Sequence, residues 1–177
     1  MNFLLRLKHW KLFLLVFGFP ALSFPATLIG LLMNSDPVYY IGLIGSSSAW
    51  VFLVFWLKES GNYLYEQLDT DLTIGSKQKL FNFNLYFVLF YSTLLILYIM
   101  VPENDTFNNV YSFAIFPMHL YSMYSLFYAI YFVSKHLSMT EGKRGKFEDF
   151  LGYFFMLWFY PIGIWTIQPK INQLINR

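Results

Sequence analysis

The chain is organised as five long runs of apolar residues separated by polar segments. The runs cover residues 12–33, 38–57, 81–101, 110–133 and 150–167, and none of them contains Asp, Glu, Lys or Arg. About 20 apolar residues in a helix cross the hydrocarbon core of a bilayer, and a helix pairs its backbone polar groups within one segment. The pattern therefore predicts an all-α integral membrane protein built as a bundle of 4–5 transmembrane helices.

The composition agrees with this pattern and excludes other classes of protein. Apolar residues make up 57% of the chain and charged residues only 12%, about half the share of an ordinary soluble domain. A soluble enzyme of 177 residues cannot bury that much apolar surface. The net charge of +2 does not indicate nucleic acid as a partner. We expect residues 1–177 to form a single membrane domain.

The basic residues predict the orientation of the chain. Ten of the twelve lie within residues 1–11, 58–80 and 134–149, whereas the connections 34–37 and 102–109 contain none. Lys and Arg are enriched on the cytoplasmic side of membrane proteins, so the amino terminus is predicted to be cytoplasmic. The same boundary is expected to hold Trp10 and Trp56, because tryptophan favours the membrane interface.

Two segments leave alternatives open. The fifth run, 150–167, either spans the membrane or forms a re-entrant segment that returns the tail to the cytoplasm, which Pro161 and Pro169 permit. The first run follows a basic start, and Ala21 to Ser23 resembles a signal-peptide cleavage site. Because the apolar run continues for ten more residues, an uncleaved first helix is the better interpretation.

A candidate intramembrane polar site lies in the fourth run. His119 is the only histidine within any run, and Ser122 and Ser125 follow it at helical spacing. We expect this face to turn inward and bury His119 against serines of other helices, since an unpaired polar group in lipid is costly. A proton- or ion-handling role is the alternative to a structural one. Four tyrosines form a second stripe on the same helix, typical of packing or of a polar path: Tyr121, Tyr124, Tyr128 and Tyr131.

Two further sets of residues predict contacts rather than chemistry. Small residues at Gly42, Gly45 and Ser46 allow close helix packing, either within the chain or between copies. In the loop 58–80, four apolar residues at near-helical spacing predict a short amphipathic helix at the membrane interface. They are Tyr63, Leu64, Leu68 and Leu72.

The chain has few of the side chains that catalysis within a membrane requires. The chain has no cysteine, and the runs hold no carboxylate and no cluster of metal-ligating residues. We therefore expect no enzymatic activity, no cofactor and no metal. The sequence favours a membrane subunit that acts through interaction or regulation, or a self-assembling, channel-like oligomer. The alternative is a small-solute or proton-linked carrier that uses kinked helices and His119. Expected partners are the lipid bilayer and either copies of the chain or another membrane protein.

Two terminal stretches carry a resemblance. The segments 4–13, LLRLKHWKLF, and 159–172, FYPIGIWTIQPKIN, resemble small polytopic inner-membrane proteins of Bacteroidetes-type bacteria. The resemblance implies a multi-pass protein of a bacterial cytoplasmic membrane. It covers only these short segments, and it implies no activity and no site residue.

Overall fold

The computed structural model describes residues 3–68, 77–100 and 105–176, and every regular element within them is helical. In chain order the elements are α1 (Phe3–Arg6), α2 (His9–Phe13), the π-helix η1 (Leu14–Gly18), α3 (Phe19–Leu32), α4 (Asp36–Glu66), α5 (Gln78–Met100), α6 (Asp105–Thr140), α7 (Phe147–Trp158) and α8 (Tyr160–Ile175). The prediction of an all-α chain is confirmed over these residues.

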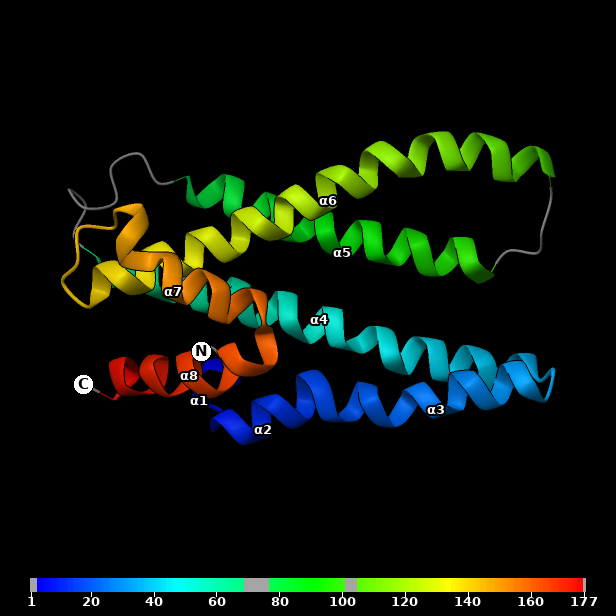
Figure 1. Cartoon of the computed structure of the whole chain (residues 1–177), viewed down its shortest axis with the longest axis horizontal. Coiled ribbons are helices and arrows are strands. Elements are labelled where there is room, and N and C mark those ends of the chain that lie inside the picture. Colours follow the sequence, from blue (N-terminus) through cyan, green and yellow to red (C-terminus); the bar gives the residue numbers. More distant parts are fainter. Residues whose placement is uncertain (1–2, 69–76, 101–104, 177) are drawn as a thin grey trace.

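Two antiparallel helical hairpins form the body of the molecule, as Figure 1 shows. One consists of α3 and α4 and the other of α5 and α6, and α4 contacts α3, α5 and α6. The hairpins diverge toward the end at which α3 turns into α4, whereas α7 and α8 pack at the opposite end. The largest fully buried side chains come from α1, α2, α4, α5, α6 and α8, and they include Leu5, Leu12, Trp56, Phe81, Phe132 and Ile167.

Among the described residues, three helical segments are long and apolar enough to cross a membrane: His9–Leu32, Asp36–Glu66 and Gln78–Ile99. They cover the first three predicted runs except for the last one or two residues of the first and third runs. The fourth run lies in α6, which is 36 residues long but is not among the three.

The first segment is helical throughout but changes its winding at η1. Pro20 lacks an N–H group, and its ring would clash with the carbonyl of Val16, one turn earlier, in a regular α-helix. The wider π turn over Leu14–Gly18 stands directly before this proline and accommodates the mismatch.

The segment expected to form a separate interfacial helix belongs in part to α4. This helix continues to Glu66, so Tyr63 and Leu64 lie on its last turns, and Leu64 is fully buried in the core. Leu68 is half-buried just beyond the helix, and Leu72 lies outside the described residues. The prediction of a free interfacial helix is wrong for Leu64, because its spacing reflects packing against the protein core rather than against lipid.

The fifth apolar run is not one continuous helix. Phe159 interrupts it with φ −88° and ψ 64°, and Pro161 then begins α8. At 1.5 Å per residue, the 12 residues of α7 measure about 18 Å, well short of a bilayer core of about 30 Å. α8 runs back to contact α1 and α2. Residues 150–167 thus form two helical segments, in α7 and the start of α8, rather than the one continuous helix of the spanning alternative.

A tight turn joins α3 to α4. Asn34 adopts a left-handed conformation with φ 50°, and the next N–H, that of Ser35, donates to the carbonyl of Gly30 at 2.9 Å. The N–H of Asn34 donates to the carbonyl of Leu31 at 3.4 Å. This is a Schellman motif, which pairs the last carbonyls of α3 and reverses the chain without a long loop.

The small residues of α4 let α3 approach closely. A Cβ atom added to Gly42 would lie 2.2 Å from the backbone nitrogen of Thr27. One added to Gly30, on α3, would lie 2.3 Å from the backbone nitrogen of Tyr39. Both neighbours are backbone atoms, so a side chain at either glycine would force the two helices apart.

We expect Gly42→Ala to destabilise the α3–α4 hairpin by about 1–3 kcal/mol, the usual effect of overpacking. Gly152→Ala is the matched control, because a Cβ atom at Gly152 meets nothing within 4 Å. Alanine favours a helix over glycine, so the control should be neutral or slightly stabilising. Thermal unfolding in detergent, followed by tryptophan fluorescence, compares the two variants. Equal melting temperatures would contradict the close packing of α3 on α4.

Candidate functional site

A cavity of about 300 Å³ opens between α4, α5 and α6. We call it the lateral groove; its principal lining residues are Ser47 and Trp50 of α4, Tyr91 and Ile96 of α5, and His119 and Met123 of α6. The walls are mostly apolar, and the polar groups are hydroxyls and one imidazole. The groove lies between the two hairpins, since α4 belongs to one of them and α5 and α6 to the other.

His119 and Tyr91 form the polar centre of the lateral groove. The hydroxyl oxygen of Tyr91 lies 2.8 Å from Nδ1 of His119. The hydroxyl donates to the ring when the imidazole carries its proton on Nε2. Tyr91 is buried, whereas His119 is exposed. The predicted burial of His119 is therefore wrong, because its ring borders an open groove; its hydrogen bond to a neighbouring helix comes from a tyrosine rather than from the expected serines.

The predicted polar face of α6 is divided between two environments. Ser122 lines the lateral groove with His119. Ser125 is fully buried instead, and its hydroxyl donates to Oδ1 of Asn84 at 3.4 Å. Tyr121 donates to the same oxygen at 3.0 Å. Of the three candidate residues, the structure thus brings only His119 and Ser122 together in a space that a ligand can enter.

The small residues Gly42, Gly45 and Ser46 are used within the chain. Gly42 faces Thr27, and a Cβ atom on Gly45 would lie 2.5 Å from the hydroxyl oxygen of Ser23, so both glycines pack against α3. Ser46 donates to the carbonyl of Leu43 in its own helix at 3.0 Å. This face is therefore occupied in the single chain.

A buried glutamine joins the two ends of the chain. Gln168 of α8 is fully buried and accepts a hydrogen bond from the indole Nε1 of Trp56 at 2.7 Å. Its amide nitrogen lies 2.9 Å from the carbonyl oxygens of Leu5 and Leu7, to which it donates. Leu5 lies in α1 and Leu7 just beyond its end, so neither carbonyl has a partner in a continuing helix. Trp56 is accordingly buried and does not belong to the predicted interfacial belt.

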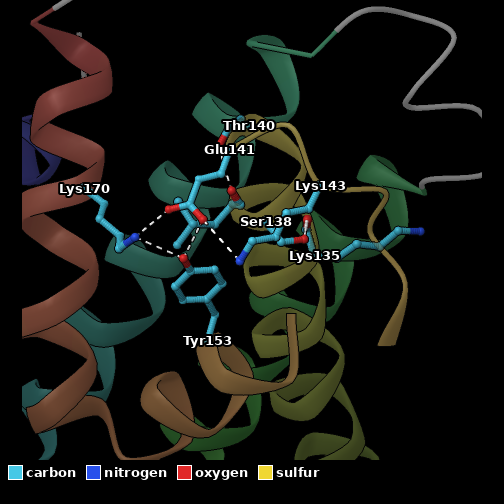
Figure 2. A network of polar contacts seen from close by, with 8 residues as sticks. Lys135, Ser138, Thr140, Glu141, Lys143, Tyr153 and Lys170 are labelled. Atoms are coloured by element: carbon cyan, nitrogen blue, oxygen red, sulfur yellow. Dashed lines mark hydrogen bonds and ion pairs between the residues drawn. The ribbon is translucent and has the colours of Figure 1, made fainter. Parts of the chain in front are cut away.

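A second polar network holds α8 to the end of α6 (Figure 2). Lys170 donates to Oε1 of Glu141 at 2.5 Å, and Tyr153 of α7 donates to Oε2 at 2.5 Å. Lys170 also lies 3.0 Å from the hydroxyl oxygen of Tyr153, and Lys143 lies 3.5 Å from Oε2 of Glu141. We call these four residues the Glu141 network. One carboxylate thus faces two ammonium groups, and Figure 2 shows them converging above the ring of Tyr153.

The Glu141 network shifts the pKa of two of its members. Partial burial alone would raise the pKa of Glu141, but the hydrogen bonds from Lys170 and Tyr153 and the charges of both lysines lower it below its usual value. The hydrogen bonds to Glu141 and Tyr153 raise the pKa of Lys170. Both shifts favour the charged pair near neutral pH.

Sequence reasoning missed the residues that hold these clusters together. Gln168 and Glu141 each follow an apolar run, where a polar residue is ordinarily expected to lie at the membrane interface. Their partners become evident only in the structure, where α8 packs against α1 and α2. Within the described part of the chain, no three His, Asp or Glu side chains are grouped to hold a metal ion. No protein-family model, curated protein or solved structure matches the chain.

Acid should weaken the Glu141 network before it affects the core. Because the pKa of Glu141 is lowered by folding, its stabilisation is present above the usual carboxyl pKa of about 4.3 and is lost as the pH falls through the lowered value. Glu141→Gln should therefore cost about 0.5–1 kcal/mol at pH 7, after allowance for solvent screening, and flatten the acid limb of the stability profile. Thermal unfolding between pH 3 and 8 measures this. Glu148→Gln, at an exposed position of α7, is the control, and an unchanged acid limb in Glu141→Gln would contradict the pairing.

Proposed function

We propose that this chain is a multi-pass protein of a bacterial inner membrane, with its amino terminus in the cytoplasm, that acts without catalysis as an interaction subunit. In this proposal the lateral groove receives a transmembrane helix of a partner. The three segments long and apolar enough to cross a membrane support the location. The charge distribution of the loops supports the orientation.

The observation that carries the proposal is the state of His119. Its Nδ1 atom is paired with Tyr91, but among the described residues no hydrogen bond reaches Nε2, and the residue is exposed at the groove. If α6 spans the bilayer, this nitrogen lies about ten residues inside the apolar run. An unpaired polar group at that depth costs on the order of 1–3 kcal/mol, so an occupant that supplies a hydrogen bond is favoured.

The lining of the lateral groove fits a helix better than an acyl chain. An acyl chain would fill the apolar walls but would leave Nε2 of His119 without a partner. A transmembrane helix presents both apolar side chains and occasional Ser, Thr, Asn or Gln residues that hydrogen-bond across interfaces. With Tyr91 donating to Nδ1, Nε2 carries the proton and needs an acceptor. Ser47 and Ser92 on the walls donate to carbonyls of their own helices, and neither is hydrogen-bonded to His119.

A carrier of small solutes or protons is the second candidate, and it uses the same observation. An exposed imidazole in a groove between helices can exchange protons, and Pro117 interrupts the hydrogen bonds of α6 two residues earlier. A carrier needs its groove free for solute, whereas an interaction subunit needs it filled by protein. Occupancy of the groove therefore separates the two functions.

Site-directed crosslinking tests the occupancy, and the absence of native cysteine makes the chain suitable for it. A cysteine introduced by Met123→Cys and labelled with a photoreactive benzophenone places the probe in the groove. The same label on Leu22→Cys places it on the exposed outer face of α3. We expect a discrete protein adduct from position 123 and none from position 22. An adduct of twice the 21.0 kDa chain mass identifies a second copy, and any other mass identifies a different protein.

Adding His119→Ala should lower the yield of that adduct about threefold, since interhelical hydrogen bonds in membranes average about 0.6 kcal/mol. His119→Gln should restore most of it, because glutamine keeps a donor and an acceptor. Reaction with lipid alone at both positions would overturn the proposal and favour the carrier.

The orientation has its own test. Reporter fusions after Thr106 should read as external and fusions after Gly142 as cytoplasmic. A fusion at Arg177 should also read as cytoplasmic, because α8 runs back toward the end of the molecule that holds α1 and α2. An external Arg177 would instead require α7 and α8 to cross the membrane together, and the opposite pattern at the first two sites would overturn the orientation.

A further inference from the structure

A second groove, chemically unlike the lateral groove, lies where α6 passes the start of α5. Its volume is about 270 Å³. We call it the basic groove; its lining includes Lys77, Leu80, Tyr124, Tyr128, Tyr131 and Lys135. The tyrosines and Lys135 recur every three or four residues, so they share one face of α6.

The basic groove offers positive charge and hydroxyl donors without a carboxylate. Two ammonium groups, from Lys77 and Lys135, and three phenol hydroxyls border it, and no Asp or Glu is among the described residues that line it. The ammonium group of Lys135 lies 5.9 Å from the ring centroid of Tyr131. His136 closes the groove as a buried ring, with Nδ1 2.7 Å from the carbonyl oxygen of Phe132. Such a set of donors recognises an anion.

The long axis of the groove indicates an amphipathic anion. Tyr124 and Lys135 are eleven residues apart, which is about 16 Å along a helix. The lysine end lies toward the loop that carries Lys143, Arg144 and Lys146, whereas the Tyr124 end continues into the apolar run. Tyrosine rings favour the boundary between hydrocarbon and water, where they contact apolar chains and donate to polar groups. A soluble anion would use only the lysine end.

We propose that the basic groove binds the headgroup of an anionic phospholipid of the cytoplasmic leaflet. The two lysines contact the phosphate, the tyrosine hydroxyls donate to phosphate or glycerol oxygens, and the tyrosine rings pack along the first part of an acyl chain. At about 30 Å³ for each water in the liquid, the groove has room for roughly nine waters, enough for a phosphodiester headgroup. This inference rests on the proposed membrane location and orientation, but it is independent of what fills the lateral groove.

Lipid titration of the purified full chain tests the proposal. Phosphatidylglycerol and phosphatidylcholine with identical acyl chains are added to the protein in neutral detergent, and bound lipid is counted by native mass spectrometry. We expect selective retention of phosphatidylglycerol. The double variant Lys77→Gln/Lys135→Gln should weaken it about fivefold for each lysine, or roughly 25-fold, since a basic residue near an anionic lipid surface contributes about 1 kcal/mol.

The control variant Lys8→Gln/Lys11→Gln removes the same charge from the same predicted side of the membrane and should retain the lipid. Tyr128→Phe keeps the ring and should lose only a few-fold in affinity. Equal loss in the control would show a diffuse charge effect and overturn the site. Competition by inorganic phosphate at concentrations that match the lipid would show a site for a soluble anion and also overturn it. Crosslinking from position 123 should be unchanged in the double lysine variant. If the lipid proposal fails, the partner proposal for the lateral groove can therefore still be tested by itself.

Discussion

The hydrogen bonds of Gln168 are the constraint on which the shape of the molecule most depends. The short helix α1 ends at Arg6, so the carbonyls of Leu5 and Leu7 have no partners in a continuing helix. The amide of Gln168 donates to both, and its oxygen accepts from Trp56 on α4. One side chain therefore connects the amino-terminal segment, the central helix and the returning helix α8. It can do so only because Phe159 breaks the last apolar run and sends α8 back.

The all-helical character of the chain was predictable because a missing charge over 20 residues is a strong signal. The limits of the helices were not, since α4 and α6 extend well beyond the apolar runs and the fifth run is broken at Phe159. The partners of polar groups were not, because they depend on how distant helices meet. Gln168 and Trp56 both stand near the ends of runs, where an interfacial position is the ordinary expectation. His119 was expected to be buried because the sequence alone shows that a polar ring facing lipid is costly. The groove beside it could not be predicted, because it depends on how α4, α5 and α6 are arranged in space.

The helix α6 links the features that carry the two proposals. Toward its amino-terminal half it presents His119 to the lateral groove, and in its carboxy-terminal half Tyr128 and Lys135 line the basic groove. Its last turn leads to Glu141, which fixes α8 through Lys170. Binding at either groove would therefore involve the same helix. A lipid bound in the basic groove would affect how α6 packs against α5. These two helices also form part of the wall of the lateral groove.

The treatment of polar groups in the interior distinguishes structural residues from functional ones. Asn62 and Asn82 exchange amide hydrogen bonds at 3.0 and 3.1 Å, and Gln78 adds a third bond to this pair, so these amides pair with one another between α4 and α5. Gln168 is likewise satisfied. His119 differs, because its second ring nitrogen borders a space large enough for a side chain of another molecule. Asn84 is also only partly paired, because its oxygen accepts from Tyr121 and Ser125 while its buried amide nitrogen has no partner among the described residues. What sets the second ring nitrogen of His119 apart is its place at an open groove, where an occupant can pair it.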